Sequence, residues 1–71
     1  MKVAVIGSGG REHAIVKKLK ESKLVDKLYA IPGNGGMTGD AECVAIGVNE
    51  TDKIVDFVKV NGIEYVVVTP D

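Results

Sequence analysis

A glycine-rich turn between an apolar run and an amphipathic segment constrains most strongly how this chain can fold. The run Val3 to Ile6 is rich in β-branched residues and is followed by Gly7, Gly9 and Gly10. A short apolar run bounded by glycines is typical of a parallel strand buried on both faces. From Arg11 to about Glu21 the period changes to that of a helix, with lysines opposite the apolar stripe. That predicted stripe comprises Ala14, Ile15, Val16 and Leu19.

A second strand is predicted at Leu28 to Ile31. It should stop at Pro32 and Gly33, because proline lacks the donor that a strand ladder needs and glycine permits turn dihedrals. The following loop, residues 32–39, holds four of the nine glycines, so we expect irregular structure there. Cys43 to Ile46 is predicted as a short third strand.

A second helix and a last strand complete the pattern. Asn49 or Thr51 can cap a helix that runs to about Asn61, and Gly62 is placed as its C-terminal stop. Ile54, Val55 and Val58 form its expected core-facing stripe. Tyr65 to Val68 is a strongly apolar final strand.

The alternation predicts one α/β domain over residues 1–71, with the element order β-α-β-β-α-β. Such a chain forms a doubly wound parallel sheet with helices on its faces. Ligands of these sheets bind at the carboxyl ends of the strands. Those ends are residues 7–10, 32–36 and 69–71. A chain that stops at its own ligand edge is expected to be a fragment of a longer enzyme.

Composition excludes several other classes. The net charge of −1 gives no electrostatic case for nucleic acid. No apolar run is long enough for a secretory signal or a membrane span, so we expect no membrane partner and a cytoplasmic location. The single cysteine, Cys43, has no disulfide partner and no clustered metal ligands. We expect it to be a buried small hydrophobe in a reducing compartment.

The glycine turn has the features of a phosphate site. Its glycines allow backbone amides to approach an anion, and the next helix directs the positive end of its dipole to the same place. A dinucleotide fingerprint, however, needs glycine where Glu12 stands and an acidic residue at the end of the second strand, where Ile31 and Pro32 stand. These departures disfavour NAD. The turn can also be a tight connection with no ligand.

Neighbouring polar residues allow two interpretations each. Glu12 can be a helix-start residue favoured by the dipole, or it can bind a ribose hydroxyl or an amine. Arg11 can bind a phosphate or remain solvated. His13 is expected near the surface or the crevice, and a proton-transfer role lacks an identifiable partner. Asn34 can cap a turn or present its amide to a sugar.

Three stretches together carry a family resemblance. "GSGGREHA" from Gly7, "PGNGG" from Pro32 and the terminal "VVVTPD" resemble, in order and spacing, the amino-terminal domain of phosphoribosylamine-glycine ligase, also called glycinamide ribonucleotide synthetase. The resemblance covers essentially all 71 residues. The chain departs from the family at Thr69 and Asp71, because the family usually reads "GPE" where this chain reads "TPD".

The resemblance implies a Rossmann-like, pre-ATP-grasp fold, truncated here, and a place in de novo purine biosynthesis. The family's whole enzyme uses ATP and Mg²⁺ (or Mn²⁺) to join glycine to 5-phosphoribosylamine. By likeness the substrate-binding residues are Gly7, Gly9, Gly10, Arg11, Glu12, Pro32, Gly33, Asn34, Thr69 and Asp71. Of these, Gly9, Gly10 and Arg11 would line the sugar phosphate, and Glu12 and Asn34 would face the ribose or amine.

The resemblance also implies what the chain lacks. The ATP-grasp portion, which would bind ATP, glycine and the metal, is outside these residues, so we expect no catalytic residue, bound cofactor or ligase activity from this chain alone. Two other functions stay open on the residues themselves. One is a dinucleotide- or nucleotide-binding module, and the other is a structural docking domain whose glycines only shape turns.

Overall fold

The structure is a computed structural model that describes residues 1–68, so Thr69 and Asp71 lie outside the described residues. It has the α/β order predicted from the sequence, with one additional short 3-10 turn. The elements are β1 (Lys2–Gly7), α1 (Gly10–Lys20), β2 (Lys27–Pro32), η1 (Gly35–Met37), β3 (Glu42–Cys43), α2 (Thr51–Asn61) and β4 (Tyr65–Val68). The four strands form one parallel sheet, which confirms the predicted Rossmann-like fold class.

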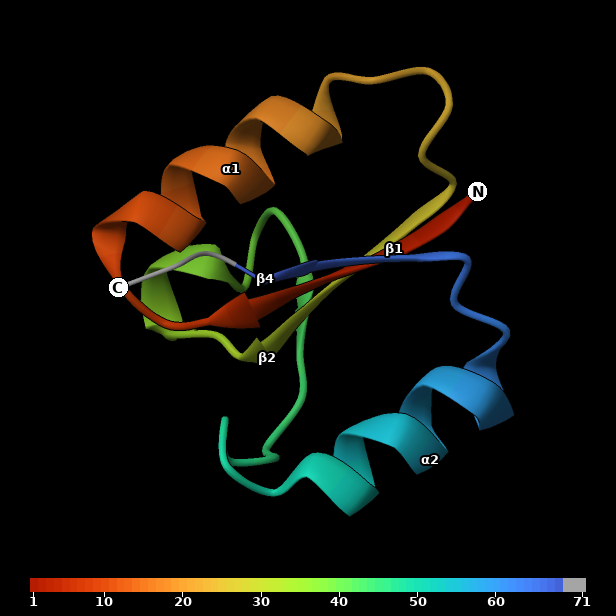
Figure 1. Ribbon diagram of the computed structural model, residues 1–71. Helices are drawn as coiled ribbons and strands as arrows, with labels where there is room; N and C mark the ends of the chain where they lie inside the picture. The colour runs from red at the N-terminus through yellow and green to blue at the C-terminus, as the bar shows by residue number, and fades with distance from the viewer. Residues whose placement is uncertain (69–71) are drawn as a thin grey trace.

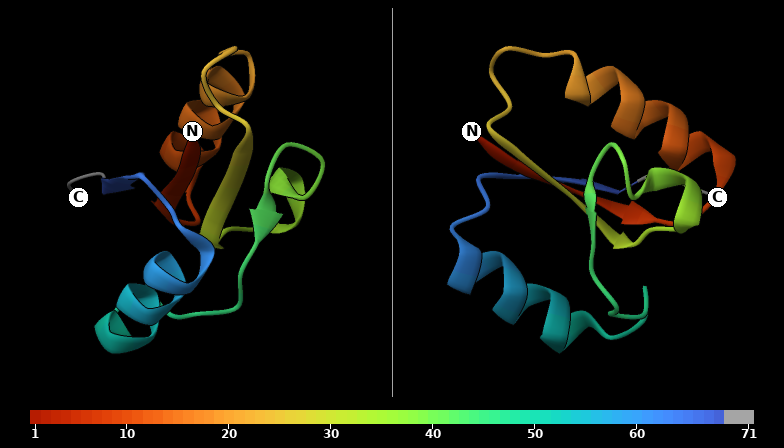
Figure 2. Two further views of the ribbon diagram at one scale, coloured as in Figure 1. Left: turned by 90° about the vertical axis from the view of Figure 1, so that its right-hand side faces the viewer. Right: turned by 180° about the vertical axis from the view of Figure 1, so that it is seen from behind.

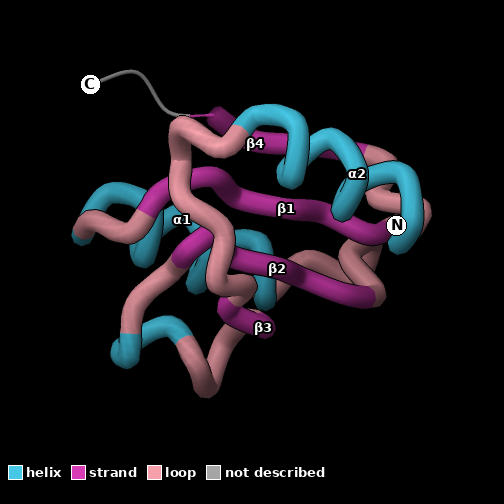
Figure 3. The backbone as a smooth tube through the Cα atoms, turned by 90° about the horizontal axis from the view of Figure 1, so that it is seen from below, coloured by secondary structure: helices cyan, strands magenta, loops and turns pink. Residues whose placement is uncertain are grey.

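The sheet has the order β3-β2-β1-β4, so the first strand is central as predicted (Figure 3). β1 pairs with β2 from Lys2 opposite Lys27 to Gly7 opposite Pro32. On its other side, β1 pairs with β4 from Val3 opposite Tyr65. This register brings the end of β1 beside the end of β2, and these are the two ends that the sequence marks with glycine.

One helix covers each face of the sheet (Figures 1 and 2). Successive side chains of a strand point to opposite faces, so β1 contributes to two cores. Val3 and Val5 pack in the cluster that contains Val16 of α1, while Ala4 packs with residues that contact α2. All three β1 side chains are at most 1% exposed, as expected of a strand covered on both faces.

The predicted helical stripes are partly wrong. In α1, Val16 is buried and Ile15 and Leu19 pack against the same core, but Ala14 is exposed. In α2, Val55 is 42% exposed and Phe57 packs in its place beside Ile54 and Val58. Spacing defines a helical stripe only to within about one residue, because the width of the buried face depends on the partner surface.

Phe57 anchors α2 to the sheet through an aromatic contact. Its ring meets Tyr29 of β2 edge to face, with the ring centroids 5.0 Å apart and an interplanar angle of 85°. The N-cap of α2 is Glu50, without a side-chain cap hydrogen bond, so the predicted caps Asn49 and Thr51 are wrong by one residue in either direction. Gly62 ends the helix in the left-handed conformation, with φ +64°, as predicted.

The region between β2 and α2 differs most from expectation. β3 comprises only Glu42–Cys43, shorter than the predicted strand, and Cys43 is half-buried rather than buried. The glycine-rich loop is not fully irregular, because Asn34 caps the 3-10 turn Gly35–Met37. Within residues 1–68, neither helix is long and apolar enough to cross a membrane.

Candidate functional site

The loops that follow β1 and β2 are joined at the carboxyl edge of the sheet. The backbone N–H of Gly33 donates to the carbonyl of Gly7 over 3.1 Å. Nδ2 of Asn34 donates to the carbonyl of Ser8 over 2.5 Å, while its Oδ1 accepts from the N–H of Gly36 over 2.8 Å. One amide side chain therefore holds the two loops together. The two predicted stretches meet, and the third, residues 69–71, lies outside the described part of the chain.

Glu12 lies against the glycine turn. Gly7 is buried with φ +138°, and a Cβ atom at this position would lie 2.7 Å from the carboxyl carbon of Glu12. A Cβ at Gly9 would lie 3.3 Å from Glu12 Oε2. A side chain at position 7 would be strained at this φ, and it would also displace the Glu12 carboxyl group, so the fold favours glycine here. A carboxylate thus occupies the place where a dinucleotide fingerprint has its third glycine.

The start of α1 is open on its outer side. Gly9 is the N-cap in extended conformation, and its carbonyl accepts from the N–H of His13 over 3.0 Å. Gly10 is exposed, and a Cβ there would meet no atom of residues 1–68 within 4 Å. The same is true of Gly35 in the facing loop, and neither glycine has a positive φ. Packing among the described residues explains Gly7 but not these two glycines. Arg11, also exposed, follows directly.

Gly33 sets the backbone conformation at the start of the loop that follows β2. It has φ +71°, and a Cβ there would lie 2.6 Å from Cys43 Sγ. The Cys43 thiol in turn lies 3.5 Å from the carbonyl oxygen of Asn34, to which it donates. Pro32, half-buried, is the last residue of β2. Glycine at position 33 is therefore needed both for the turn and for contact with β3, and it brings Asn34 to the edge.

His13 has a partner that its sequence position did not reveal. Its Nε2 lies 3.6 Å from Oδ2 of Asp40, and Nζ of Lys20 lies 3.0 Å from Oδ1 of the same carboxylate. The hydrogen bond from Lys20 is the main cause that lowers the pKa of Asp40 below its ordinary value of 3.8. Asp40 is 27 residues beyond His13 in the sequence, so only the folded chain joins them. The sequence indicates this cluster only through the spacing of His13, Lys17 and Lys20, which places them on one face of the helix.

A cavity of about 560 Å³ lies away from the glycine turn, beside the start of β2 and the end of the loop. Its charged side chains are paired, since Lys27 lies 3.2 Å from Glu42 and Lys20 lies 3.0 Å from Asp40. Among residues 1–68, no group of three or more His, Cys, Asp or Glu side chains is placed to hold a metal ion. The carboxyl edge is therefore the candidate site, and its polar groups are suited to hydroxyl, amine or phosphate groups.

Comparison with known proteins gives a consistent result over the whole chain. The family described as "Phosphoribosylglycinamide synthetase, N domain" matches residues 1–71. Phosphoribosylamine–glycine ligase of Streptococcus pneumoniae strain R6 is 53% identical over 72 residues, which cover 100% of this chain and 17% of that protein. The ligases of Caldanaerobacter subterraneus subsp. tengcongensis and Agrobacterium fabrum are 51% and 45% identical over 71 residues, with the same coverage.

The chain spans about a sixth of the length of these curated relatives. The match includes both loops of the carboxyl edge and every described strand and helix. The chain belongs to the family of phosphoribosylglycinamide synthetase N domains.

Proposed function

We propose that this chain is the amino-terminal part of a phosphoribosylamine–glycine ligase and that its carboxyl edge contributes to binding 5-phosphoribosylamine. The whole protein would join glycine to that amine in purine biosynthesis, in the cytoplasm. Family membership and the names of the relatives support this assignment. The structural observation that carries it is the Asn34 bridge, which fixes two glycine loops beside each other at the edge where ligands of such sheets bind.

The proposed roles follow the chemistry of the edge. Gly9, Gly10 and Arg11 would line the sugar phosphate, since Gly10 is open and Arg11 is exposed at the positive end of α1. The carboxylate of Glu12 would face the amine or a ribose hydroxyl. This division suits the charges, because a phosphate placed directly on Glu12 would be repelled and an ammonium group would be attracted.

The remaining predicted site residues would shape the pocket. Gly7 accommodates Glu12, while Pro32 and Gly33 lead the chain into the Asn34 loop. Asn34 already uses one N–H and its oxygen within the chain, so its amide has one further N–H for a ligand. Thr69 and Asp71 are proposed as site residues at the end of β4, outside the described residues.

ATP and Mg²⁺ (or Mn²⁺) are assigned to the rest of the longer protein. When bound, they would activate the glycine carboxylate by phosphoryl transfer. The described residues do not fit a metal, because they bring no cluster of three or more such ligands together. Glycine would also bind through an ATP-grasp portion outside this chain. We predict that the 71-residue chain has no ligase activity alone.

The proposal is tested by titrating the isotope-labelled chain with ribose 5-phosphate and recording amide NMR spectra. We expect shifts confined to residues 7–12 and 32–36. The Asn34→Ala variant should lose most of the response, because it removes the bridge between the loops. Asn49→Ala, an exposed asparagine before α2, is the matched control and should respond as the parent does.

A parallel titration with NAD separates the proposal from a dinucleotide-binding module. Glu12 lies against the turn that would receive the pyrophosphate, so NAD should produce no shifts there. Saturable shifts with NAD and none with ribose 5-phosphate would reject the proposed substrate class. A dispersed spectrum that neither ligand changes would favour a docking domain.

A further inference from the structure

The loop between β2 and β3 is fixed to the rest of the chain at both of its ends. At its start, Asn34 binds the carbonyl of Ser8. At its end, Asp40 and the carbonyl of Gly39 both bind Nζ of Lys20, at 3.0 and 3.1 Å. Between these points, Met37 is fully buried in the core under α1. The loop therefore lies along α1, with the candidate site at one end and a charged cluster at the other.

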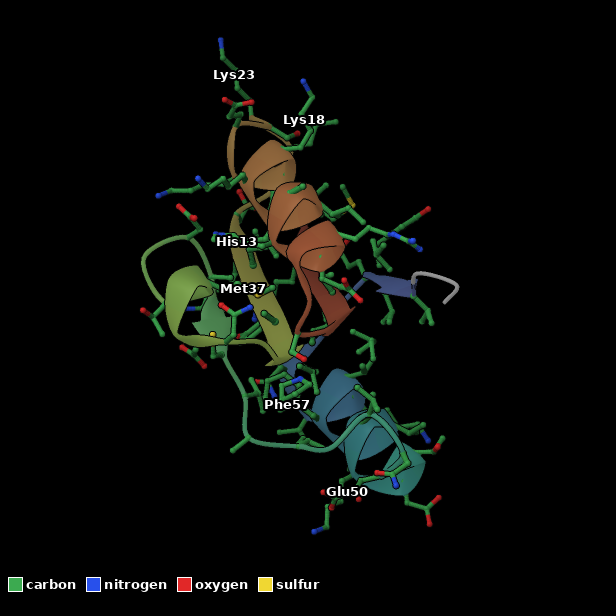
Figure 4. All side chains as sticks on the ribbon, turned by 90° about the vertical axis from the view of Figure 1, so that its left-hand side faces the viewer. His13, Lys18, Lys23, Met37, Glu50 and Phe57 are labelled. Carbon is green, nitrogen blue, oxygen red and sulfur yellow. The ribbon has the colours of Figure 1, made fainter. Side chains whose placement is uncertain are left out.

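His13 links the two ends. Its Nε2 is buried, has no hydrogen-bond partner among residues 1–68 and lies 3.6 Å from Oδ2 of Asp40. The neighbouring edge of the same ring lies near the 3-10 turn, where a Cβ at Gly36 would be 3.2 Å from Cε1 and 3.6 Å from Nδ1 of His13. Figure 4 shows His13 and Met37 on the side of α1 that faces the loop, whereas Lys18 points away. Asp40 and the Gly36 turn thus contact one imidazole.

We propose that His13, Asp40 and Lys20 form a positioning cluster that sets the place of the Asn34 turn relative to the glycine turn. The cluster touches no ligand and takes no part in chemistry. It acts by limiting the positions of a loop that is rich in glycine and therefore loses much conformational freedom when ordered. The inference rests on the proposed function only where ligand affinity is measured.

The geometry favours a local effect over a global one. The side chains of His13, Lys20 and Asp40 are 27%, 54% and 21% exposed, so water screens their interaction. Such a cluster adds little to the stability of the whole fold but can select among loop positions. The positive charge of Lys17 also lowers the pKa of that carboxyl, after the larger effects of Lys20 and His13. The carboxylate is therefore the centre to which each partner is attached.

The test compares four variants of the chain by NMR without ligand. Asp40→Asn removes the charge, Lys20→Met removes the cation, Lys20→Arg keeps it, and Lys18→Met is the matched control on the outer face of α1. We expect the Asn34 side-chain amide and the Gly36 amide to shift in Asp40→Asn and Lys20→Met. Lys20→Arg should restore them, and Lys18→Met should leave them unchanged. The ¹⁵N resonance of His13 Nε2 should shift in Asp40→Asn.

Ligand affinity gives the second measurement. In Asp40→Asn and Lys20→Met the loop should occupy its binding position for a smaller fraction of the time. The apparent Kd for ribose 5-phosphate then rises in inverse proportion to that fraction, and we expect a rise on the order of 3- to 10-fold. The double variant Lys20→Met/Asp40→Asn should lose less affinity than the sum of the two single effects, because both changes break the Lys20–Asp40 contact.

Each outcome separates the two proposals. Unchanged Asn34 and Gly36 resonances in a folded Asp40→Asn or Lys20→Met chain would overturn the positioning role. Lys20 is exposed enough that its replacement keeps the fold, so a misfolded Asp40→Asn chain does not block the test. If those resonances shift as expected while the parent fails to bind ribose 5-phosphate, the positioning role stands and the proposed substrate fails.

Discussion

At the scale of single residues, the backbone conformation at position 7 and the side chain of Glu12 together favour glycine there. Gly7 combines a φ of +138°, which residues with a side chain rarely adopt, with contact from the Glu12 carboxyl group. Gly10, three residues later, has neither constraint. The two glycines look equivalent in the sequence, yet one is required by the fold and the other leaves space at the edge.

Replacing these glycines should separate the two roles. Gly7→Ala should lower the free energy of unfolding by about 1–3 kcal/mol through backbone strain, with a further loss from the contact with Glu12. Gly10→Ala should be neutral or slightly stabilising, because alanine suits the first turn of a helix better than glycine does. Urea unfolding of both variants measures the difference. Equal losses would contradict the assignment of Gly7 as the constrained position.

At the scale of elements, α2 is attached more weakly than α1. No residue of α2 is fully buried, whereas α1 buries Val16 completely. Phe57, half-buried against Tyr29, supplies the specific contact. The helix also depends on Gly62 for its end, where φ is +64°. These two positions, rather than the exposed Val55, should control how firmly α2 is held.

Truncating the aromatic contact tests this assignment. Phe57→Ala should lower the free energy of unfolding by about 1–2 kcal/mol, below the value for a fully buried phenylalanine because the ring is only half-buried. Val55→Ala should change it by less than about 0.5 kcal/mol, since the side chain is exposed. Thermal unfolding of both variants is the measurement. A larger effect at Val55 would restore the stripe predicted from spacing.

The helix end gives an independent check. Gly62→Ala should cost about 1–2 kcal/mol, because an L-residue is strained in the left-handed region. Gly39→Ala is the control, since Gly39 has an ordinary φ and open space around it, and it should change stability little or raise it. Amide hydrogen exchange in residues 58–63 would show whether the loss at Gly62 is confined to the end of α2.

Element order was predictable because β-branched runs, helical spacing and glycine stops are local signals. The two-residue β3 was not, since its partner residues Tyr29 and Ala30 are distant in sequence. The candidate site shows the same division. Its glycine and asparagine positions could be predicted from their motifs, but the Asp40 partner of His13 depends on how the loop folds back along α1.

At the scale of the whole molecule, surface charges are arranged in pairs, of which two join distant segments and one lies at the start of α2. Asp26 binds the N-terminal amino group, Asp40 binds Lys20, and Glu50 binds Lys53. In each case the hydrogen bond from the cation is the main cause that lowers the pKa of the carboxyl, from ordinary values of 3.8, 3.8 and 4.5. Glu50 in turn raises the pKa of Lys53 above 10.5.

These shifts predict the direction of the pH dependence. A lowered carboxyl pKa contributes stability that is complete above its ordinary value and is lost as the pH falls through the folded value. Stability should therefore decline below about pH 4.5. The contribution of Lys53 should be lost above about pH 10.5. Urea midpoints from pH 2 to 8 measure the acid side, and the double variant Asp40→Asn/Glu50→Gln should show a shallower decline. A midpoint that rises as the pH falls from 5 to 3 would contradict this.

The bond from Asn34 to Ser8 has a consequence for how any occupant of the edge acts on the chain. It joins residues 26 positions apart, in the two loops that follow the paired strands β1 and β2. In an unfolded chain the two loops are not held together, so the pocket is absent. A molecule that binds there recognises the folded state alone, and at 100 times its Kd it should add about 2.7 kcal/mol to the free energy of unfolding. In that sense the substrate would act as a folding cofactor for the domain that receives it.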